Sequence, residues 1–158
     1  ELVHRGGCIS KGYWNNKEST AKRFKEHKEF PGEIVLYSGD LVYKDNEGYL
    51  FFIGRNDEMM KRDGIRISPS EIELVAIEHP DVLEVVAFQK HINQDSEQII
   101  LCYTSSLESG VPESDLKTFL RVKPPRHMLP DRFIFFENFL TTGNEGKIDR
   151  SWVKGEIT

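Results

Sequence analysis

The stretch Gly54–Glu73, GRNDEMMKRDGIRISPSEIE, constrains the fold more than any other part of the sequence. It follows a segment rich in aromatic residues and ends in Ser68-Pro69-Ser70-Glu71, a capping-box pattern with proline at the first helical position. Between these ends lie a Gly-Arg-x-Asp turn, a lysine and a Gly-x-Arg step. Apolar spacing does not explain so many special residue types, so the residues alone predict a turn-rich, charged junction between two structural units.

The residues before the junction predict short strands, turns and one helix. A strand is expected at Leu2–Arg5, and Asn15 or Asn16 is a candidate N-cap for a helix that runs to about His27. Strand-forming residues flank Asp45-Asn46-Glu47-Gly48, which predicts a β-hairpin with Gly48 at the position that needs positive φ. This part of the chain is therefore expected to be β-rich.

The residues after the junction predict a compact α+β unit. The expected elements, in order, are strands at 82–88 and 98–103 joined as a hairpin, a helix at 112–122, a strand at 132–136 and a short helix at 151–157. Arg121, Lys123, Arg126, His127 and Arg132 form a basic cluster in this unit, which is either a solvated patch or an attractor of phosphate groups.

Composition excludes some classes of function. Lys and Arg total 21 against 26 Asp and Glu, which argues against a general nucleic-acid binder because phosphate contacts need a basic face. Cys8 and Cys102 form no C-x-x-C motif and the five histidines lack ligand spacing, so we expect no metal site and a cytoplasmic, reducing setting. We expect no membrane span and no signal peptide. The opening Glu1-Leu2-Val3 is typical of the middle of a strand, so we expect a fragment of a longer protein.

The junction closely resembles the signature of the adenylate-forming (AMP-binding) enzymes, which include acyl-CoA synthetases, luciferases and the adenylation domains of peptide synthetases. Tyr37–Leu41 resembles that family's T-G-D-L motif, and Gly146–Arg150 resembles its G-K-[IV]-D-R loop. The resemblance covers essentially the whole chain. It implies that residues 1–56 end the large N-terminal domain, and that 57–158 form the small mobile C-terminal domain, an α+β fold with a short central sheet flanked by helices.

The resemblance implies that three residues contact the nucleotide. Asp40 matches the residue that accepts hydrogen bonds from the ribose hydroxyls of ATP, a task that suits a carboxylate with its two acceptor oxygens. Arg55 matches a residue in the ribose and phosphate region, and Arg66 matches a position near the phosphate. Without the resemblance, Asp40 would be a structural turn residue and Arg55 a surface ion-pair partner, so both alternatives stay open.

Three further residues of the junction match positions linked to domain movement. Asp57 matches the family's hinge residue, and aspartate tolerates two backbone conformations better than a β-branched residue does. Lys61 matches a lysine that luciferase-like members use in their second conformation, although a solvated side chain is an equal alternative. Gly64 matches the glycine that lets the pantetheine arm of coenzyme A pass close to the backbone in the thioester-forming state.

The resemblance implies that Lys147 is the catalytic lysine of adenylation. A compact ammonium can bridge the attacking carboxylate and the α-phosphate of ATP, where negative charge gathers. The preceding Asn144-Glu145-Gly146 is one residue longer than the common N-G of the family, so the reach of the loop is a separate question.

The main functional hypothesis is the C-terminal fragment of an ATP-dependent, AMP-forming acyl-CoA ligase. The wording I-S-P-S-E-I-E favours it over peptide synthetases, and a role in fatty acid metabolism is expected with it. ATP/AMP would be bound together with Mg²⁺, which the missing N-terminal domain would hold, and coenzyme A would be the co-substrate. The first alternative loads the phosphopantetheine of an acyl carrier protein, and the second is a non-catalytic docking module. The fragment alone is expected to be inactive.

Overall fold

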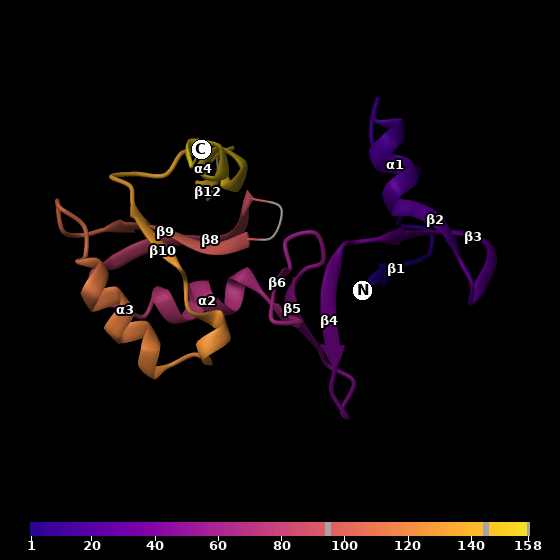
Figure 1. Cartoon of the computed structure of the whole chain (residues 1–158). Helices are drawn as coiled ribbons and strands as arrows, with labels where there is room; N and C mark the ends of the chain where they lie inside the picture. The colour runs from indigo at the N-terminus through magenta and orange to yellow at the C-terminus, as the bar shows by residue number, and fades with distance from the viewer. Residues whose placement is uncertain (94–95, 144–145, 158) are drawn as a thin grey trace. The chain divides into compact units, whose positions relative to one another are not determined.

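The computed structural model describes residues 1–93, 96–143 and 146–157 (Figure 1). The chain forms two compact units, Glu1–Asp57 and Glu58–Thr158, and each is described by itself. Among the described residues, no helix is long and apolar enough to cross a membrane.

The first unit is built mainly from strands. Its elements are β1 (Val3–His4), α1 (Lys17–Arg23), β2 (Phe24–His27), β3 (Phe30–Tyr37), β4 (Asp40–Lys44) and β5 (Leu50–Arg55). Strand β3 lies between β1 and β2 in an antiparallel sheet, and β4 and β5 form a separate antiparallel pair. Phe24 and Val35 are the apolar side chains buried in this unit among the described residues, so its core is small.

Helix α1 begins where the sequence predicts and ends earlier. The Asn16 side chain accepts a hydrogen bond from Ser19 N at 2.9 Å, which confirms the expected N-cap. The predicted extension to His27 is wrong, because Phe24 already has extended backbone angles and pairs with Leu36 of β3. Pairing with a strand has overridden local helix propensity here.

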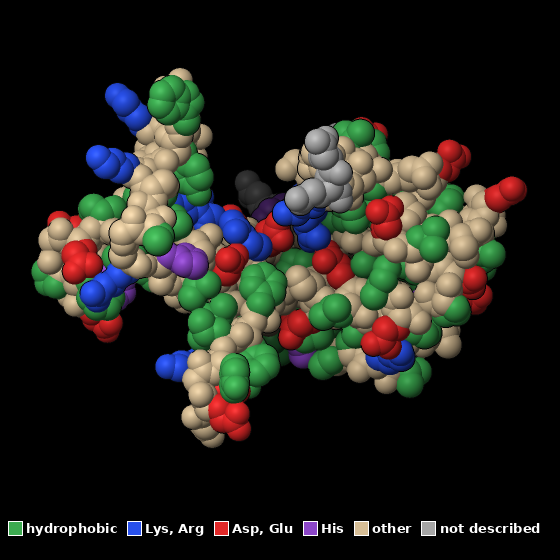
Figure 2. All heavy atoms as spheres, turned by 180° about the vertical axis from the view of Figure 1, so that it is seen from behind, with side chains coloured by type: hydrophobic (Ala, Val, Ile, Leu, Met, Phe, Trp, Pro, Cys, Tyr) green, Lys and Arg blue, Asp and Glu red, His purple; other side chains and the backbone are tan. Residues whose placement is uncertain are grey.

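The hairpin of β4 and β5 confirms the prediction made from Asp45–Gly48. Asp45 Oδ1 accepts hydrogen bonds from Glu47 N and Tyr49 N, and Gly48 has φ +96°. Large apolar side chains are exposed over both strands of this hairpin, where Figure 2 shows them gathered: Tyr43, Tyr49, Leu50, Phe51 and Phe52.

The second unit has a central sheet with strand order β10-β9-β8. Strand β8 (Val82–Asn93) pairs antiparallel with β9 (Ser96–Ser105), and β10 (Arg132–Phe135) pairs parallel with β9. The remaining elements are β6 (Met60–Arg62), β7 (Ile65–Ile67), α2 (Pro69–Ala76), α3 (Glu113–Val122), the 3-10 helix η1 (Arg126–Met128), β11 (Thr141–Thr142), β12 (Lys147–Ile148) and α4 (Arg150–Glu156). This arrangement confirms the α+β class and the central sheet flanked by helices.

Alternation along the strands gives this sheet two buried faces. Ala87 and Leu101 point to the face covered by α2 and α3, where Ile72 and Leu120 pack against them. Their neighbours Val86, Phe88, Ile100 and Cys102 point to the opposite face, which α4 covers with Val153. Because both faces are covered, β8 and β9 carry nearly continuous apolar runs rather than a polar alternation.

The predicted capping box starts α2. Ser68 N donates to Glu71 Oε2 at 3.1 Å, and Pro69 occupies the first helical position, where its missing N–H costs no helical hydrogen bond. The segment 54–73 is thereby divided into the end of β5, the β6–β7 hairpin and the first turn of α2.

Candidate functional site

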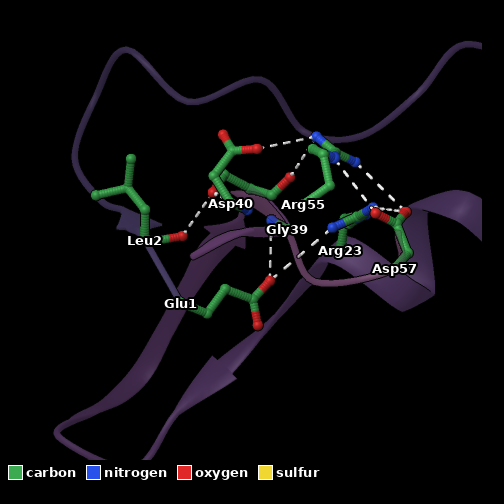
Figure 3. A network of polar contacts seen from close by, with 8 residues as sticks. Glu1, Leu2, Arg23, Gly39, Asp40, Arg55 and Asp57 are labelled. Atoms are coloured by element: carbon green, nitrogen blue, oxygen red, sulfur yellow. Dashed lines mark hydrogen bonds and ion pairs between the residues drawn. The ribbon is translucent and has the colours of Figure 1, made fainter. Parts of the chain in front are cut away.

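In the first unit, the pairing of β4 with β5 brings Asp40 opposite Arg55 (Figure 3). Arg55 Nη1 lies 3.1 Å from Asp40 Oδ1, and the two side chains are 38% and 30% exposed. Among the described residues, Arg55 donates to Asp40 Oδ1, and Asp40 Oδ2 remains available for another donor. The pair is therefore preorganised and still reachable from solvent.

Asp57 is held between two arginines. Arg55 Nε lies 3.3 Å from Asp57 Oδ1, and Arg23 Nη2 lies 3.1 Å from Asp57 Oδ2 (Figure 3). Partial burial raises the pKa of Asp57, but the hydrogen bond and charge of Arg55, with the charge of Arg23, outweigh it and hold the pKa below its usual value. The hydrogen bond to Asp57 in turn raises the pKa of Arg55, against the opposing effect of burial.

The loop before Asp40 is shaped by side-chain contacts and one close approach. Ser38 Oγ donates to Leu2 O at 2.9 Å and accepts from Asp40 N at 3.0 Å, and Glu1 Oε1 accepts from Gly39 N at 2.9 Å. Gly39 has φ +85°, and a Cβ there would lie 1.9 Å from Arg23 Nη1. The positive φ favours glycine at this position, and a side chain there would also displace the Arg23 guanidinium.

Sequence reasoning missed Arg23. No motif surrounds it, and an arginine in the last turn of a helix is an ordinary choice because it complements the helix dipole. Its contact with Asp57 arises from the folded path of the chain over 34 residues, which the local sequence does not encode.

In the second unit, Lys61, Gly64 and Arg66 share the β6–β7 hairpin. Asp63 and Gly64 form its two-residue turn with φ +53° and +80°, and Lys61 pairs directly with Arg66 across the strands. A Cβ on Gly64 would meet nothing within 4 Å, so conformation rather than crowding within the chain selects glycine. The Asp-Gly step between two short strand-forming runs is a signal from which this hairpin could have been predicted.

Two side chains anchor this hairpin to the rest of the unit. The Gln89 amide accepts from Lys61 N at 3.0 Å and donates to Lys61 O at 2.7 Å, so it pairs with both backbone groups of that residue. Arg62 donates to Leu129 O at 2.7 Å and forms an ion pair with Asp131. Both anchored residues belong to β6, so the hairpin is held through this strand.

Arg62 also lines a cavity of about 550 Å³ in the second unit. The other lining residues are Arg121, Arg126, Leu129, Pro130 and Asp131. Two members of the predicted basic cluster, Arg121 and Arg126, therefore meet at this cavity, whereas Lys123 forms an ion pair with Glu78.

Lys147 lies on a different hairpin of the second unit, β11–β12, where it is exposed and pairs with Thr142. The Ile148 side chain packs against the cluster under α4, and Asp149 caps α4 by accepting from Trp152 N at 3.0 Å. Asn144 and Glu145, the site of the predicted insertion, lie outside the described residues. Within the described ranges no group of three His, Cys, Asp or Glu side chains could hold a metal ion.

The structure thus brings Asp40, Arg55 and Asp57 into one polar network of the first unit. It groups Lys61, Gly64 and Arg66 on one hairpin of the second unit and carries Lys147 on another. Each candidate residue is exposed or half-buried and can therefore be reached from solvent.

No family model matches the chain. A linear gramicidin synthase of Brevibacillus parabrevis is 37% identical over 153 residues, which cover 95% of this chain and 2% of that protein. Tyrocidine synthase 1 of the same organism is 33% identical over 150 residues, covering 95% of this chain and 14% of that protein.

Among solved structures, the anthranilate CoA ligase AuaEII in complex with anthranoyl-AMP matches with a TM-score of 0.75 and 25% identity. The match covers 98% of this chain and 28% of that one. The chain therefore spans a small part of each of these relatives.

Proposed function

We propose that this chain works in the adenylation domain of a peptide synthetase. The chain belongs to the adenylate-forming (AMP-binding) enzymes and matches their C-terminal part. In the proposed reaction a carboxylic acid and ATP give acyl-AMP and pyrophosphate, and the acyl group then passes to the phosphopantetheine thiol of a carrier protein. The observation that carries the choice is the 37% identity to a gramicidin synthase over nearly the whole chain. The sequence of residues 67–73 favours an acyl-CoA ligase, whereas the similar proteins favour the alternative, an enzyme that loads a carrier protein.

In the adenylation step, a carboxylate oxygen attacks the α-phosphorus and pyrophosphate leaves. We assign charge stabilisation at that point to the Lys147 ammonium, because negative charge gathers on the attacking and phosphoryl oxygens. Asp40 would accept hydrogen bonds from the ribose hydroxyls, with Arg55 beside it holding the carboxylate and contacting the same region. Arg66, paired with Lys61 across the hairpin, would lie near the phosphate. A docking module would have no use for this set of residues.

Asp57 is proposed as the hinge. It is the last residue of the first compact unit, and Glu58 is the first of the second, which supports a movement centred on this peptide bond. We further assign residues 1–56 to the end of a large N-terminal domain and 57–158 to the small mobile domain. Gly64 and Lys61 would then serve the thioester-forming pose, with Gly64 at the tip of its hairpin leaving the passage open.

The second candidate function transfers the acyl group to coenzyme A. It is favoured by the fold shared with a CoA ligase and by the cavity lined with Arg121 and Arg126, whose charges would attract phosphate groups; the charge of Arg62 at the same cavity is paired with Asp131. The two candidates share the first half-reaction and differ in the acceptor.

The test uses the full-length protein that carries this chain. Acid-dependent exchange of labelled pyrophosphate into ATP, measured over a panel of amino acids, aryl acids and fatty acids, would support adenylation, and its absence with every acid would contradict it. Transfer of the activated acyl group to a holo-carrier protein but not to coenzyme A would support the first candidate, and the reverse would support the second. The chain alone is expected to give background exchange.

A further inference from the structure

Arg150 connects three separate segments of the second unit. Its Nη2 lies 2.8 Å from Glu73 Oε1 on α2 and donates to Ala87 O on β8 at 3.0 Å. Its Nε lies 3.6 Å from Glu58 Oε1, on the first residue after Asp57. The guanidinium is 25% exposed, and its Nε is buried without a hydrogen-bond partner among the described residues. The Arg150 guanidinium therefore interacts with three partners at once. Its planar fork of N–H donors allows this, and a lysine ammonium does not reproduce that geometry.

The contacts at Ala87 satisfy backbone groups at an open edge of the central sheet. Strand β8 is an edge of the central sheet, and Ala87 is fully buried, so its outward backbone groups need partners. Ala87 N donates to Glu73 Oε1 at 2.7 Å, and Ala87 O accepts from Arg150 at 3.0 Å. The Glu73 and Arg150 pair thus takes the place of a neighbouring strand, which gives it a defined geometry rather than that of a free surface ion pair.

Arg150 follows Lys147 by three residues, and the intervening backbone is short and bonded. Asp149 N donates to Leu140 O at 2.8 Å, and Ile148 packs into the cluster under α4. Because side chains alternate along β12, the packing of the half-buried Ile148 against this cluster leaves Lys147 facing outward. The position of the first turn of α4 therefore sets the position and direction of the Lys147 side chain. Arg150 is the charged residue that connects this first turn to α2 and β8.

We propose that Arg150 is a positioning residue for Lys147, which fixes the β12–α4 junction against α2, β8 and the segment that follows Asp57. This inference rests on the proposed adenylation function for its catalytic consequence. Its structural part concerns only the second unit and can be tested without any enzymatic activity.

The structural test is amide hydrogen exchange in this chain, with Arg150→Gln and Arg150→Lys compared with the wild type. In Arg150→Gln, the amide of Asp149 should exchange at least about tenfold faster relative to that of Ile100, whereas Arg150→Lys should show a smaller increase. The control Lys154→Gln removes a cation from the exposed side of the same helix and should leave the ratio unchanged. An unchanged ratio in Arg150→Gln, or equal acceleration at Ile100, would overturn the proposal.

The catalytic test uses pyrophosphate exchange by the full-length protein. Misplacing a catalytic group by about 1 Å costs roughly a hundredfold in rate, so Arg150→Gln should lower kcat by about that factor while KM for ATP changes less than about twofold. Arg150→Lys should recover part of the loss, and transfer from pre-made acyl-AMP should persist. A wild-type protein without exchange would contradict the proposed function and leave the amide-exchange test standing. An active wild type with an equally active Arg150→Gln variant would overturn the role of Arg150.

Discussion

Arg23, the last residue of α1, donates from Nη2 to Asp57 Oδ2 at 3.1 Å and so holds the end of the first unit to its only described helix (Figure 3). Arg55 approaches the other oxygen of the same carboxylate at 3.3 Å. If Asp57 is the hinge, its carboxylate is held to the first unit by two arginine side chains, Arg23 and Arg55. The rotation would then be confined to a short stretch of backbone rather than spread through the loop.

The first prediction concerns the pKa of Asp57, measured by ¹³C NMR titration of its carboxyl carbon in this chain. The wild-type pKa should lie below the ordinary 3.8, and Arg23→Gln should raise it because one of two neighbouring cations is lost. Arg55→Gln should raise it further, since Arg55 supplies both a hydrogen bond and a charge. Arg5→Gln, which breaks a pair with Glu33 instead, is the control and should have no effect.

The sign of the linked stability follows from the lowered pKa. A carboxylate whose folded pKa is depressed stabilises the fold above its unfolded pKa, and this contribution disappears as the pH falls through the folded pKa. Arg23→Gln should therefore weaken the first unit at neutral pH and have little effect below the folded pKa of Asp57. An equal effect at both pH values would mean that Arg23 acts through packing alone.

The second prediction is that Lys147→Ala affects adenylation alone. Loss of one preorganised charge-stabilising donor costs on the order of 3–4 kcal/mol, roughly a hundred- to a thousandfold in rate. Pyrophosphate exchange by the full-length protein should fall by that factor, while single-turnover transfer from synthetic acyl-AMP to the thiol acceptor is spared. Lys154→Ala is the matched control for charge. Equal losses in both half-reactions would argue against two poses of the small domain.

The third prediction is the reverse result for Gly64→Leu. The new side chain would project from the tip of the β6–β7 hairpin and obstruct the thiol, so transfer should slow while pyrophosphate exchange persists. Leucine at φ +80° is strained by about 1–2 kcal/mol whatever surrounds it. Gly32→Leu is the control for this strain, because Gly32 has φ +81° and also meets nothing within 4 Å. A similar loss of transfer in Gly32→Leu would remove the argument from obstruction.

Local chemistry explains which parts of the fold could be predicted. The turn of Asp45–Gly48, the Asn16 cap and the Glu71 capping box each involve residues within four positions of one another, and all three formed as predicted. The end of α1 was predicted wrongly because the competing partner of Phe24 is Leu36, which lies on another strand. Propensity decides only where no such partner intervenes.

The site divides in the same way. The positions of Asp40, Arg55, Gly64 and Lys147 could be proposed because each belongs to a short contiguous motif. The residues that hold these positions could not be recognised: Arg23 and Gln89 belong to no motif, and the G-K-[IV]-D-R motif that ends in Arg150 does not indicate its partners. The partners of all three lie 28 to 77 residues away. Such contacts depend on how strands and helices pack, and hydrophobic periodicity gives the elements without the facing of their polar side chains.

The fourth prediction concerns the two cysteines. Cys8 is exposed, whereas Cys102 is buried in β9, where burial raises the pKa of its thiol to about 12. At pH 8 roughly one Cys102 thiol in ten thousand would be ionised, and the thiolate is the reactive form. The folded chain should therefore release one equivalent of thionitrobenzoate from Ellman's reagent at pH 8, and a second only in denaturant. Cys8→Ser should abolish the first equivalent, and rapid reaction of both thiols in the native protein would show that β9 is accessible.

The fifth prediction is that the two units differ in stability. Among the described residues, the first unit buries Phe24 and Val35, whereas the second has three apolar clusters on both faces of its sheet. Hydrophobic burial is the dominant favourable term in folding, so the first unit should open at lower urea concentration. Amide exchange followed against urea should show earlier loss of protection at Val35 than at Leu101.

A core substitution separates this difference from a general weakness of the chain. Leu120 is fully buried between α3 and the sheet, and Leu120→Ala should destabilise the second unit by about 2–5 kcal/mol through lost contacts and a cavity. Protection at Leu101 should then fall while protection at Val35 stays as in the wild type, because the two residues belong to units with separate cores. Val35→Ala should instead lower protection at position 35 and leave protection at Leu101 as in the wild type. Parallel loss of protection in both units after either substitution would mean that the chain unfolds as one cooperative body and that Asp57 does not end an independent unit.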